Sequence, residues 1–274
     1  MSSVDNSEDI RAFLIAEKPI LKIEDATMDG YRRLQDQEWD LRVTTFIELP
    51  DLVAVWIHYF DLYEHAIEAR NADAAETTPT TQEEGYALQL QSRLFALTGG
   101  TGKLLLDAAC AGLYYQAYAL CRHLAESWIT IAYVLARPDM AIRWFDERSD
   151  DPSHEPPKKS TMRNEIRKNA RTKHMIEVLE MVHSNIGRYD ELSHPGPKTL
   201  EQTMTPQENR IQVGGHFNRR LAIGALHEGA GAFRILLEVW REIVPQSEEW
   251  TAHLRQTVER HRLATDRYTS GYAQ

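Results

Sequence analysis

An arginine and a histidine stand close together in the segment Arg188-Tyr-Asp-Glu-Leu-Ser-His194. A histidine with a pKa near 6.5 gives or takes a proton at neutral pH. A guanidinium stabilises negative charge on a phosphate or an oxyanion. Pro195 and Pro197 restrict the backbone directly after the histidine. The segment predicts an acid–base site made of Arg188, Tyr189 and His194; the alternative is that His194 only caps the end of a helix.

A second charged pair, Arg122 and Glu126, lies within a strongly apolar helical stretch. Residues four apart lie on one face of a helix, so the two side chains are neighbours. Tyr115 and Tyr133 fall on the same side. Two interpretations are open: an internal ion pair that fixes helix packing, or the wall of a binding site that orients a ligand or a catalytic histidine. If the pair is buried, loss of one partner costs about 3–5 kcal/mol.

A basic stretch covers residues 158–173, where Lys159, Arg163, Arg167 and Arg171 recur every four residues. Such a helix face suits an RNA backbone or an acidic protein partner. The stretch contains no aromatic residue, so it offers no surface on which bases could stack. The other interpretation is a solvated face that pairs with acidic residues of the same chain.

The glycine-rich segment 97–107 (LTGGTGKLLLD) looks like a phosphate-binding loop but does not match the Walker motif. A Walker loop needs a glycine where Leu97 stands and a serine or threonine where Leu104 stands. We therefore expect no nucleotide at this segment. Gly99 and Gly100 are predicted to end one helix, with the next helix beginning beside them.

Metal chemistry is also not predicted. Glu180 and His183, and likewise Glu191 and His194, have the E-x2-H spacing of di-iron bundles. Those bundles place the two motifs on different helices and add two further glutamates, whereas here the motifs are close neighbours in one segment. We therefore expect neither a metal site nor a cofactor.

Composition describes an ordinary globular chain of 274 residues, 42% hydrophobic and 26% charged, with a net charge of −10. An acidic chain repels nucleic acid on average. The polar N-terminus does not resemble a signal peptide, and no apolar run approaches the roughly 20 residues that span a bilayer. We expect a cytoplasmic protein without a membrane partner, with Cys110 and Cys121 reduced and buried.

Helical periodicity runs through most of the chain and predicts an all-α fold. We expect a single helical-bundle domain of about seven to nine helices around a long central helix at 102–136. Residues 1–48 are predicted to form an N-terminal helical arm, residues 49–274 the bundle, and residues 149–159 a proline-rich charged linker. The other helices are expected near 31–49, 51–70, 82–97, 160–186, 217–244 and 247–268.

Two segments, 121–127 (CRHLAES) and 189–197 (YDELSHPGP), resemble a group of bacterial all-helical proteins of unknown function that looks related to the HEPN superfamily. HEPN proteins are helical bundles that often serve as ribonucleases in toxin or defence systems, and they carry an R-x(4–6)-H motif that Arg188 and His194 match. The resemblance implies a metal-independent ribonuclease that works as a homodimer. His194 would act on the ribose 2′-oxygen or the leaving oxygen, and Arg188 would stabilise the phosphate charge.

Other functions and other motif matches stay open at this point. The chain could equally be a non-catalytic protein-interaction module of the same fold, or a small-ligand-binding bundle with its pocket beside Arg122. The R-x(4–6)-H spacing also occurs at residues 148/154, 167/174, 210/216, 220/227 and 255/261.

Overall fold

The computed structural model describes residues 25–76, 79–145, 155–170, 173–193 and 215–270. All of its elements within these ranges are helical, so the all-α prediction is confirmed. The elements are α3 (Asp25–Glu48), α4 (Pro50–Glu76), α5 (Gln82–Cys110), α6 (Tyr114–Ala136), the 3-10 helix η1 (Pro138–Trp144), α7 (Lys159–Asn169), α8 (Lys173–Ser193), α10 (Arg219–Arg241) and α11 (Glu248–Thr269).

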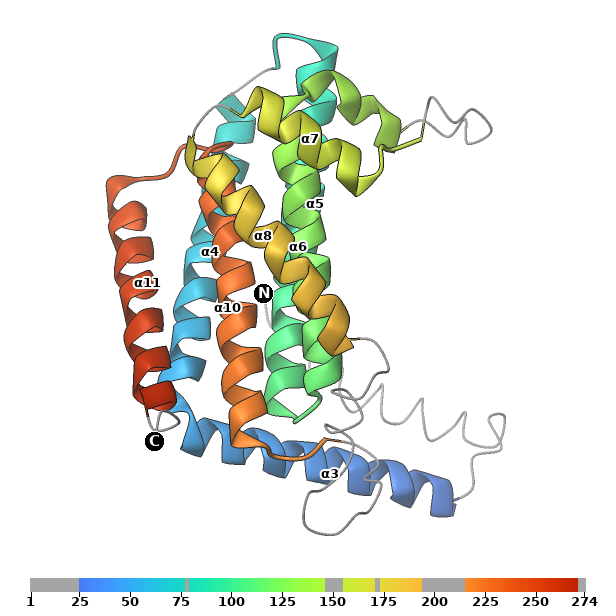
Figure 1. Ribbon diagram of the computed structural model, residues 1–274, viewed down its shortest axis with the longest axis vertical. Helices are drawn as coiled ribbons and strands as arrows, with labels where there is room; N and C mark the ends of the chain where they lie inside the picture. The colour runs from blue at the N-terminus through green and yellow to red at the C-terminus, as the bar shows by residue number, and fades with distance from the viewer. Residues whose placement is uncertain (1–24, 77–78, 146–154, 171–172, 194–214, 271–274) are drawn as a thin grey trace, which may run out of the picture.

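The helices pack as one bundle in which α4, α5, α6, α10 and α11 run along the long axis (Figure 1). Helix α3 lies across one end of the bundle, and α7 lies near the other end. Helix α8 crosses the front diagonally. Helix α6 is central, because it packs against α5, α7, α8 and α10. No helix in the described ranges is long and apolar enough to cross a membrane.

The predicted continuous helix at 102–136 is wrong, because the chain turns sharply between Cys110 and Tyr114. Gly112 adopts a φ of 73°, the left-handed conformation that favours glycine. A Cβ at this position would also lie 2.5 Å from the carbonyl oxygen of His216. Helices α5 and α6 therefore form an antiparallel hairpin, and α6 alone is the central helix (Figure 1).

Gly99 and Gly100, predicted to end a helix, lie inside α5 instead. A Cβ on Gly99 would overlap the ring of Tyr63 from α4. The Tyr63 hydroxyl donates to the carbonyl oxygens of Phe95 and Ala96, at 3.0 and 3.1 Å. The glycine serves the close approach of α4 to α5, and the helix continues through it.

Two predicted helix starts are confirmed by their caps. The Thr81 hydroxyl accepts a hydrogen bond from the Glu84 N–H at 3.2 Å, and the Ser247 hydroxyl accepts one from the Trp250 N–H at 3.1 Å. Residues 205–208 (TPQE), whose sequence matches a capping box, lie outside the described residues.

Buried tryptophans fix α10 and α11 against α4. The Trp56 indole N–H donates to the Leu226 carbonyl at 3.0 Å, and the Trp250 indole N–H donates to the Leu62 carbonyl at 2.8 Å. Each bond satisfies a buried donor and joins two helices far apart in sequence. The relative positions of α4, α10 and α11 are therefore set by specific contacts as well as by apolar packing.

Cys110 and Cys121 are free and buried, as predicted. Burial raises the pKa of the Cys110 thiol to about 12 and raises the pKa of the Cys121 thiol further. Both side chains act as small apolar groups of the core.

Candidate functional site

Most of the charged residues that the sequence indicated lie together on α6, α7 and α8. We call this surface the ion-pair face and define it by Arg122, Glu126, Lys159, Arg163 and Arg167. The Arg122 Nε donates to Glu126 at 3.0 Å, and its guanidinium also pairs with Asp190 of α8 at 2.5 Å. Each of these side chains is about one third exposed, at 36%, 32% and 39%. The Arg122–Glu126 pair lies within α6, and the Arg122–Asp190 contact joins α6 to α8, which favours the interpretation as a packing ion pair.

The basic stretch 158–173 is not one helix, because α7 ends at Asn169 and α8 begins at Lys173. The Lys159 side chain points toward α6 of its own bundle. Its ammonium donates to the Glu126 carbonyl at 3.0 Å and to the Thr130 hydroxyl at 2.7 Å. Burial lowers the pKa of Lys159, and the nearby Glu126 carboxylate opposes part of that effect.

Two further basic residues of α7, Arg163 and Arg167, are engaged with α8. Arg167 binds both carboxylate oxygens of Glu180, at 2.7 and 3.0 Å, and Arg163 lies against His183. Arg171 lies outside the described residues. The contacts favour the interpretation of a solvated face that pairs with the chain's own acids.

The predicted catalytic segment is described only in part. Arg188 pairs with Glu228 of α10 at 2.8 Å, and the buried Tyr189 has its hydroxyl 3.5 Å from the same carboxylate. His194 lies outside the described residues, so its pairing with Arg188 stays a prediction. Arg188 and Tyr189, which the sequence indicated, therefore lie beside the part of α10 that contains Glu228.

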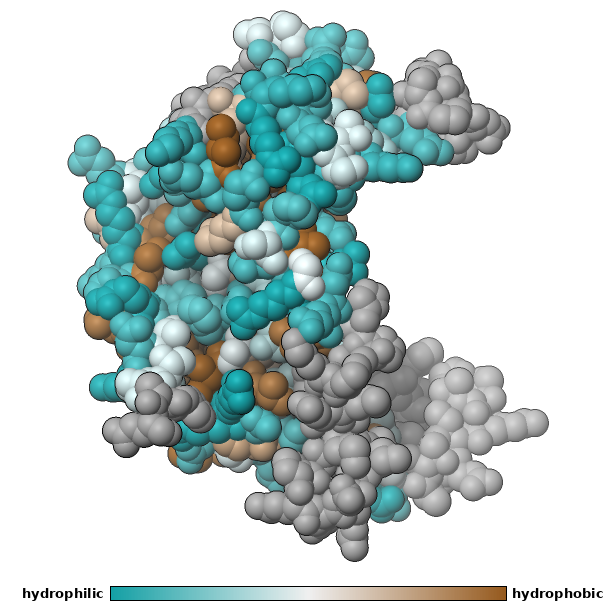
Figure 2. Space-filling view, viewed as in Figure 1, coloured by the Kyte–Doolittle hydropathy of each residue, from teal (hydrophilic) through white to brown (hydrophobic). Residues whose placement is uncertain are grey.

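This part of α10 borders a hollow of about 380 Å³ between α8, α10 and α11. Figure 1 shows α10 between the other two helices on the face turned to the viewer. In Figure 2 hydrophilic residues dominate the surface of this face, with hydrophobic residues between them. We call the hollow the histidine groove. Its polar lining residues are Asn185, Tyr189, His227, Glu228, Arg234, His261, Arg262, Thr265 and Asp266.

Two histidines from different helices meet at this groove. The His227 Nδ1 lies 2.9 Å from the His261 Nε2 and also 2.9 Å from the Thr265 hydroxyl. On the far side of His261, its Nδ1 lies 3.4 Å from the hydroxyl of the buried Tyr59. The Thr265 hydroxyl donates to the His261 carbonyl at 2.8 Å. The four side chains form one hydrogen-bonded chain from the core to the groove.

Burial favours the neutral form of both imidazoles. Burial lowers the pKa of His261 to about 3, and the charges of His227 and Arg234 lower it too. Burial also lowers the pKa of His227, although the Glu228 carboxylate beside it has the opposite effect. A neutral imidazole carries one N–H donor and one bare nitrogen, so each ring can both donate and accept.

The arginines around the groove are already paired with acids of the chain. Arg188 pairs with Glu228, Arg234 pairs with Glu238 at 3.4 Å, and Arg262 pairs with Glu259 and Asp266. The groove therefore has balanced charge.

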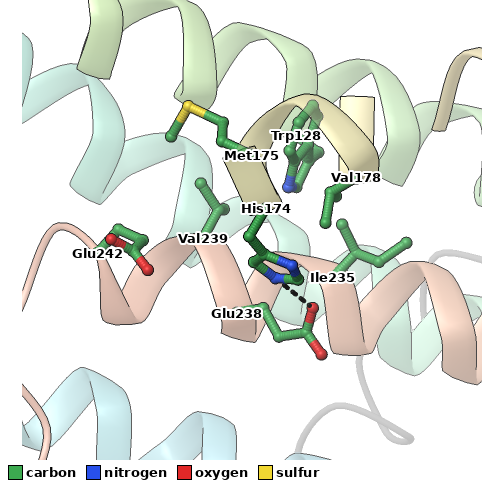
Figure 3. Close-up of a pocket in the computed structure, with 8 residues that line it drawn as sticks. All are labelled: Trp128, His174, Met175, Val178, Ile235, Glu238, Val239 and Glu242. Carbon is green, nitrogen blue, oxygen red and sulfur yellow. Dashed lines mark ion pairs between the residues drawn. The ribbon is translucent and has the colours of Figure 1, made fainter. Parts of the chain in front are cut away.

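A narrow slot continues along the seam between α8 and α10 (Figure 3). The indole nitrogen of the buried Trp128 faces it and has no hydrogen-bond partner among the described residues. His174 and Glu238 form an ion pair beside it, at 3.7 Å. The volume of about 20 Å³ suits one water molecule and no organic ligand.

Within the described ranges no three His, Cys, Asp or Glu side chains are grouped as metal ligands would be. Comparisons with protein-family models, with curated proteins and with solved structures find no match for this chain. The fold and the groove define an all-helical bundle with a charge-balanced cleft that carries a histidine pair. The resemblance to the HEPN superfamily stays a prediction.

Sequence reasoning did not single out His227 and His261. Both end an R-x(4–6)-H match, at 220/227 and 255/261, but four other matches had the same form. The two residues are 34 positions apart, and only the packing of α10 against α11 brings their rings together.

Proposed function

We propose that the protein binds a small, neutral, polar ligand in the histidine groove. The observation that carries this proposal is the hydrogen-bonded His227–His261 pair at the edge of a 380 Å³ hollow. Buried titratable groups with shifted pKa values, at a cleft with converging polar groups, are typical of ligand and catalytic sites.

The hydrogen-bond chain supports a specific role for His227. A hydroxyl has one hydrogen, and that of Thr265 goes to the His261 carbonyl. The His227 Nδ1–H is then shared between the Thr265 oxygen and a bare Nε2 of His261, which leaves the His227 Nε2 as a bare acceptor. On this assignment the ligand donates an N–H or O–H group to that nitrogen.

Size and charge narrow the class of ligand. The hollow is within the range of small-molecule sites, and the paired arginines leave little net charge to attract an anion. A neutral molecule of about the size of a nucleoside, with several hydrogen-bond donors, fits both conditions.

The test is an NMR titration of the full chain with labelled histidines, using the four ribonucleosides and a defined set of neutral polar fragments at about 1 mM. We expect at least one probe to shift the His227 ring signals. The His227→Phe variant keeps the ring volume but loses the acceptor, so it should bind that probe at least about tenfold more weakly. The matched control is His65→Phe, on the exposed surface of α4. If no probe shifts the His227 signals, the proposal is wrong.

RNA cleavage is a second candidate, favoured by the position of Arg188 and Tyr189 beside the same groove. Its test is cleavage of RNA by purified protein in EDTA, with His194→Ala and His227→Ala variants that are checked for folding. Loss of cleavage only in His194→Ala supports the predicted motif. Loss of cleavage only in His227→Ala indicates that the catalytic residues lie in the histidine groove. No cleavage by the wild-type chain rejects the ribonuclease hypothesis for the RNAs used.

A further inference from the structure

Helices α4 and α11 leave a second hollow between them, of about 460 Å³. Figure 1 shows α11 beside α4, and the two helices pack along their length. On each helix the lining residues recur at intervals of three and four, so each set lies on one helix face. They are Asp51, Ala54, Val55 and His58 of α4, and Arg260, Leu263, Ala264 and Arg267 of α11. We call this hollow the α4–α11 groove.

The α4–α11 groove has an apolar floor and polar ends. The short side chains of Ala54, Val55 and Ala264 form the floor, and Leu263, which is 53% exposed, forms an apolar wall. At one end Arg267 pairs with Asp51, and at the other end the Arg260 guanidinium donates to the His58 Nε2 at 2.6 Å. Residues 51–58 span about 10 Å of helix, so a short apolar group fits between the two ends.

Arg260 gives this groove a positive charge in an otherwise acidic chain. No carboxylate of the described residues pairs with Arg260, whose guanidinium contacts the imidazole of His58 instead. Arg267 is balanced by Asp51, so the charge of Arg260 stays uncompensated. A guanidinium offers five N–H donors in a planar fork that matches a carboxylate or a phosphate. The contact with His58 uses one end of the fork, which leaves donors for an anion.

We propose that the α4–α11 groove binds a small amphiphilic anion, whose carboxylate or phosphate group pairs with Arg260 and whose short apolar tail lies on the floor. Each half of such a ligand has a counterpart in the groove. A neutral apolar molecule leaves Arg260 without a counter-charge, whereas a purely polar anion leaves the floor in contact with water. The α4–α11 groove and the histidine groove have no lining residue in common, so the two sites are separate.

His58 reports whether an anion occupies the groove. Burial lowers the pKa of His58, and the charges of Arg260 and His253 lower it too, whereas the Asp61 carboxylate raises it. An anion on Arg260 offsets the guanidinium charge, so binding should raise the pKa of His58. The coupling is reciprocal, so the anion should bind more tightly as the pH falls and His58 gains its proton.

The first test is an NMR titration of the full chain with labelled arginine and histidine side chains. The probes are hexanoate, hexyl phosphate, acetate and 1-hexanol at pH 7. At least one of the two six-carbon anions should shift the Arg260 and His58 signals with a dissociation constant of about 1 mM or lower. Acetate lacks most of the tail and hexanol lacks the charge, so each should bind at least about tenfold more weakly. If neither six-carbon anion shifts these signals, or if acetate or hexanol binds as tightly, the proposal is wrong.

A second test separates the charge from the apolar wall, using whichever six-carbon anion binds more tightly. Arg260→Gln should weaken its binding at least about tenfold, because it removes the cation. The matched control Arg255→Gln changes another exposed arginine of α11 that does not line the groove, and should bind as the wild-type chain does. Leu263→Ser should weaken that anion at least about threefold and leave acetate unchanged.

Arg260 and Leu263 are both exposed, so we expect the variants to fold, and melting curves verify it. Equal binding by the Arg255→Gln and Arg260→Gln chains overturns the proposal. The His227 signals report on the histidine groove in the same spectra, so failure at one site is distinguishable from failure at the other.

Discussion

The ion-pair face and the histidine groove share helix α8 but use their polar groups in opposite ways. On the ion-pair face, the charged ends of Arg122 and Arg167 are bound to carboxylates of the same chain. In the groove, His227 and His261 lie within hydrogen-bond distance of each other, and neither is paired with a carboxylate of the described residues. The charges of the ion-pair face join α6 and α7 to α8. The groove instead contains a pair of imidazoles.

The difference lies in how far the polar groups are paired: the arginines of the ion-pair face are bound to carboxylates, whereas the histidines are held by neutral partners. Exposed ion pairs contribute little to stability and are easily replaced by water. A neutral imidazole held in a buried hydrogen-bond chain has a defined orientation and an altered pKa. Four substitutions or conditions test this contrast, beginning with the largest expected effect.

His261→Ala should lower the free energy of unfolding by about 2–4 kcal/mol. The side chain is 4% exposed, and its loss leaves a cavity and removes the partner of His227 and of the Tyr59 hydroxyl. Urea unfolding at pH 7.5 measures the change. The control His65→Ala, on the exposed surface of α4, should cause no measurable loss. Equal effects of the two substitutions would show that the chain of hydrogen bonds stabilises nothing.

Acid should destabilise the wild-type chain more than the His261→Gln variant. The pKa of His261 is about 3 in the folded state and 6.5 in the unfolded state. Below pH 6.5 the unfolded chain therefore binds a proton that the folded chain does not, so this contribution to stability falls as the pH falls. At pH 5 it amounts to about 2 kcal/mol.

The measurement compares unfolding of both proteins at pH 7.5 and at pH 5. His58 and His216 also have pKa values lowered by burial and remain in the variant, whereas His227 contacts His261 directly, so the difference between the proteins reports the histidine pair. Parallel pH profiles would contradict the depressed pKa.

Lys159→Met should lower the free energy of unfolding by about 1–2 kcal/mol. Methionine keeps the apolar stem but removes the ammonium that satisfies Glu126 and Thr130. Thermal unfolding followed by circular dichroism measures the change. Lys158→Met, at the exposed neighbouring position, is the matched variant. A larger effect at position 158 than at position 159 would contradict the structural role of the half-buried Lys159 ammonium.

Arg167→Ala should change the melting temperature by less than about 2 °C. Its ion pair with Glu180 is 40% and 50% exposed, so water replaces most of the interaction. A calorimetric scan at low salt gives the ion pair its largest effect. A drop of about 8 °C or more would mean that this pair supports the α7–α8 contact.

The predicted elements were most accurate where apolar periodicity and caps coincided. The helix starts at Gln82 and Glu248 follow from Thr81 and Ser247, whose side chains act locally. The turn at Gly112 was missed, because the apolar stripe continues through it without a polar interruption. The predicted helix end at Gly99 was wrong, because the role of this glycine depends on the ring of Tyr63, which is distant in sequence.

The candidate site was less predictable than the fold, because its residues are far apart in the sequence. Arg122 and Glu126 are neighbours on one helix, so their pairing followed from spacing. His227 and His261 meet only after α10 and α11 have packed, and no local pattern encodes that contact.

The tight turn at 111–113 favours early pairing of α5 and α6 during folding. Helices α5 and α6 are adjacent in sequence and pack extensively, so little loop-closure entropy opposes their pairing. We expect this hairpin to form before α10 and α11 pack on it from more distant parts of the chain. The histidine groove is then among the last features to form and among the first to open in local unfolding, so hydrogen exchange is expected to be faster at its walls than in α6.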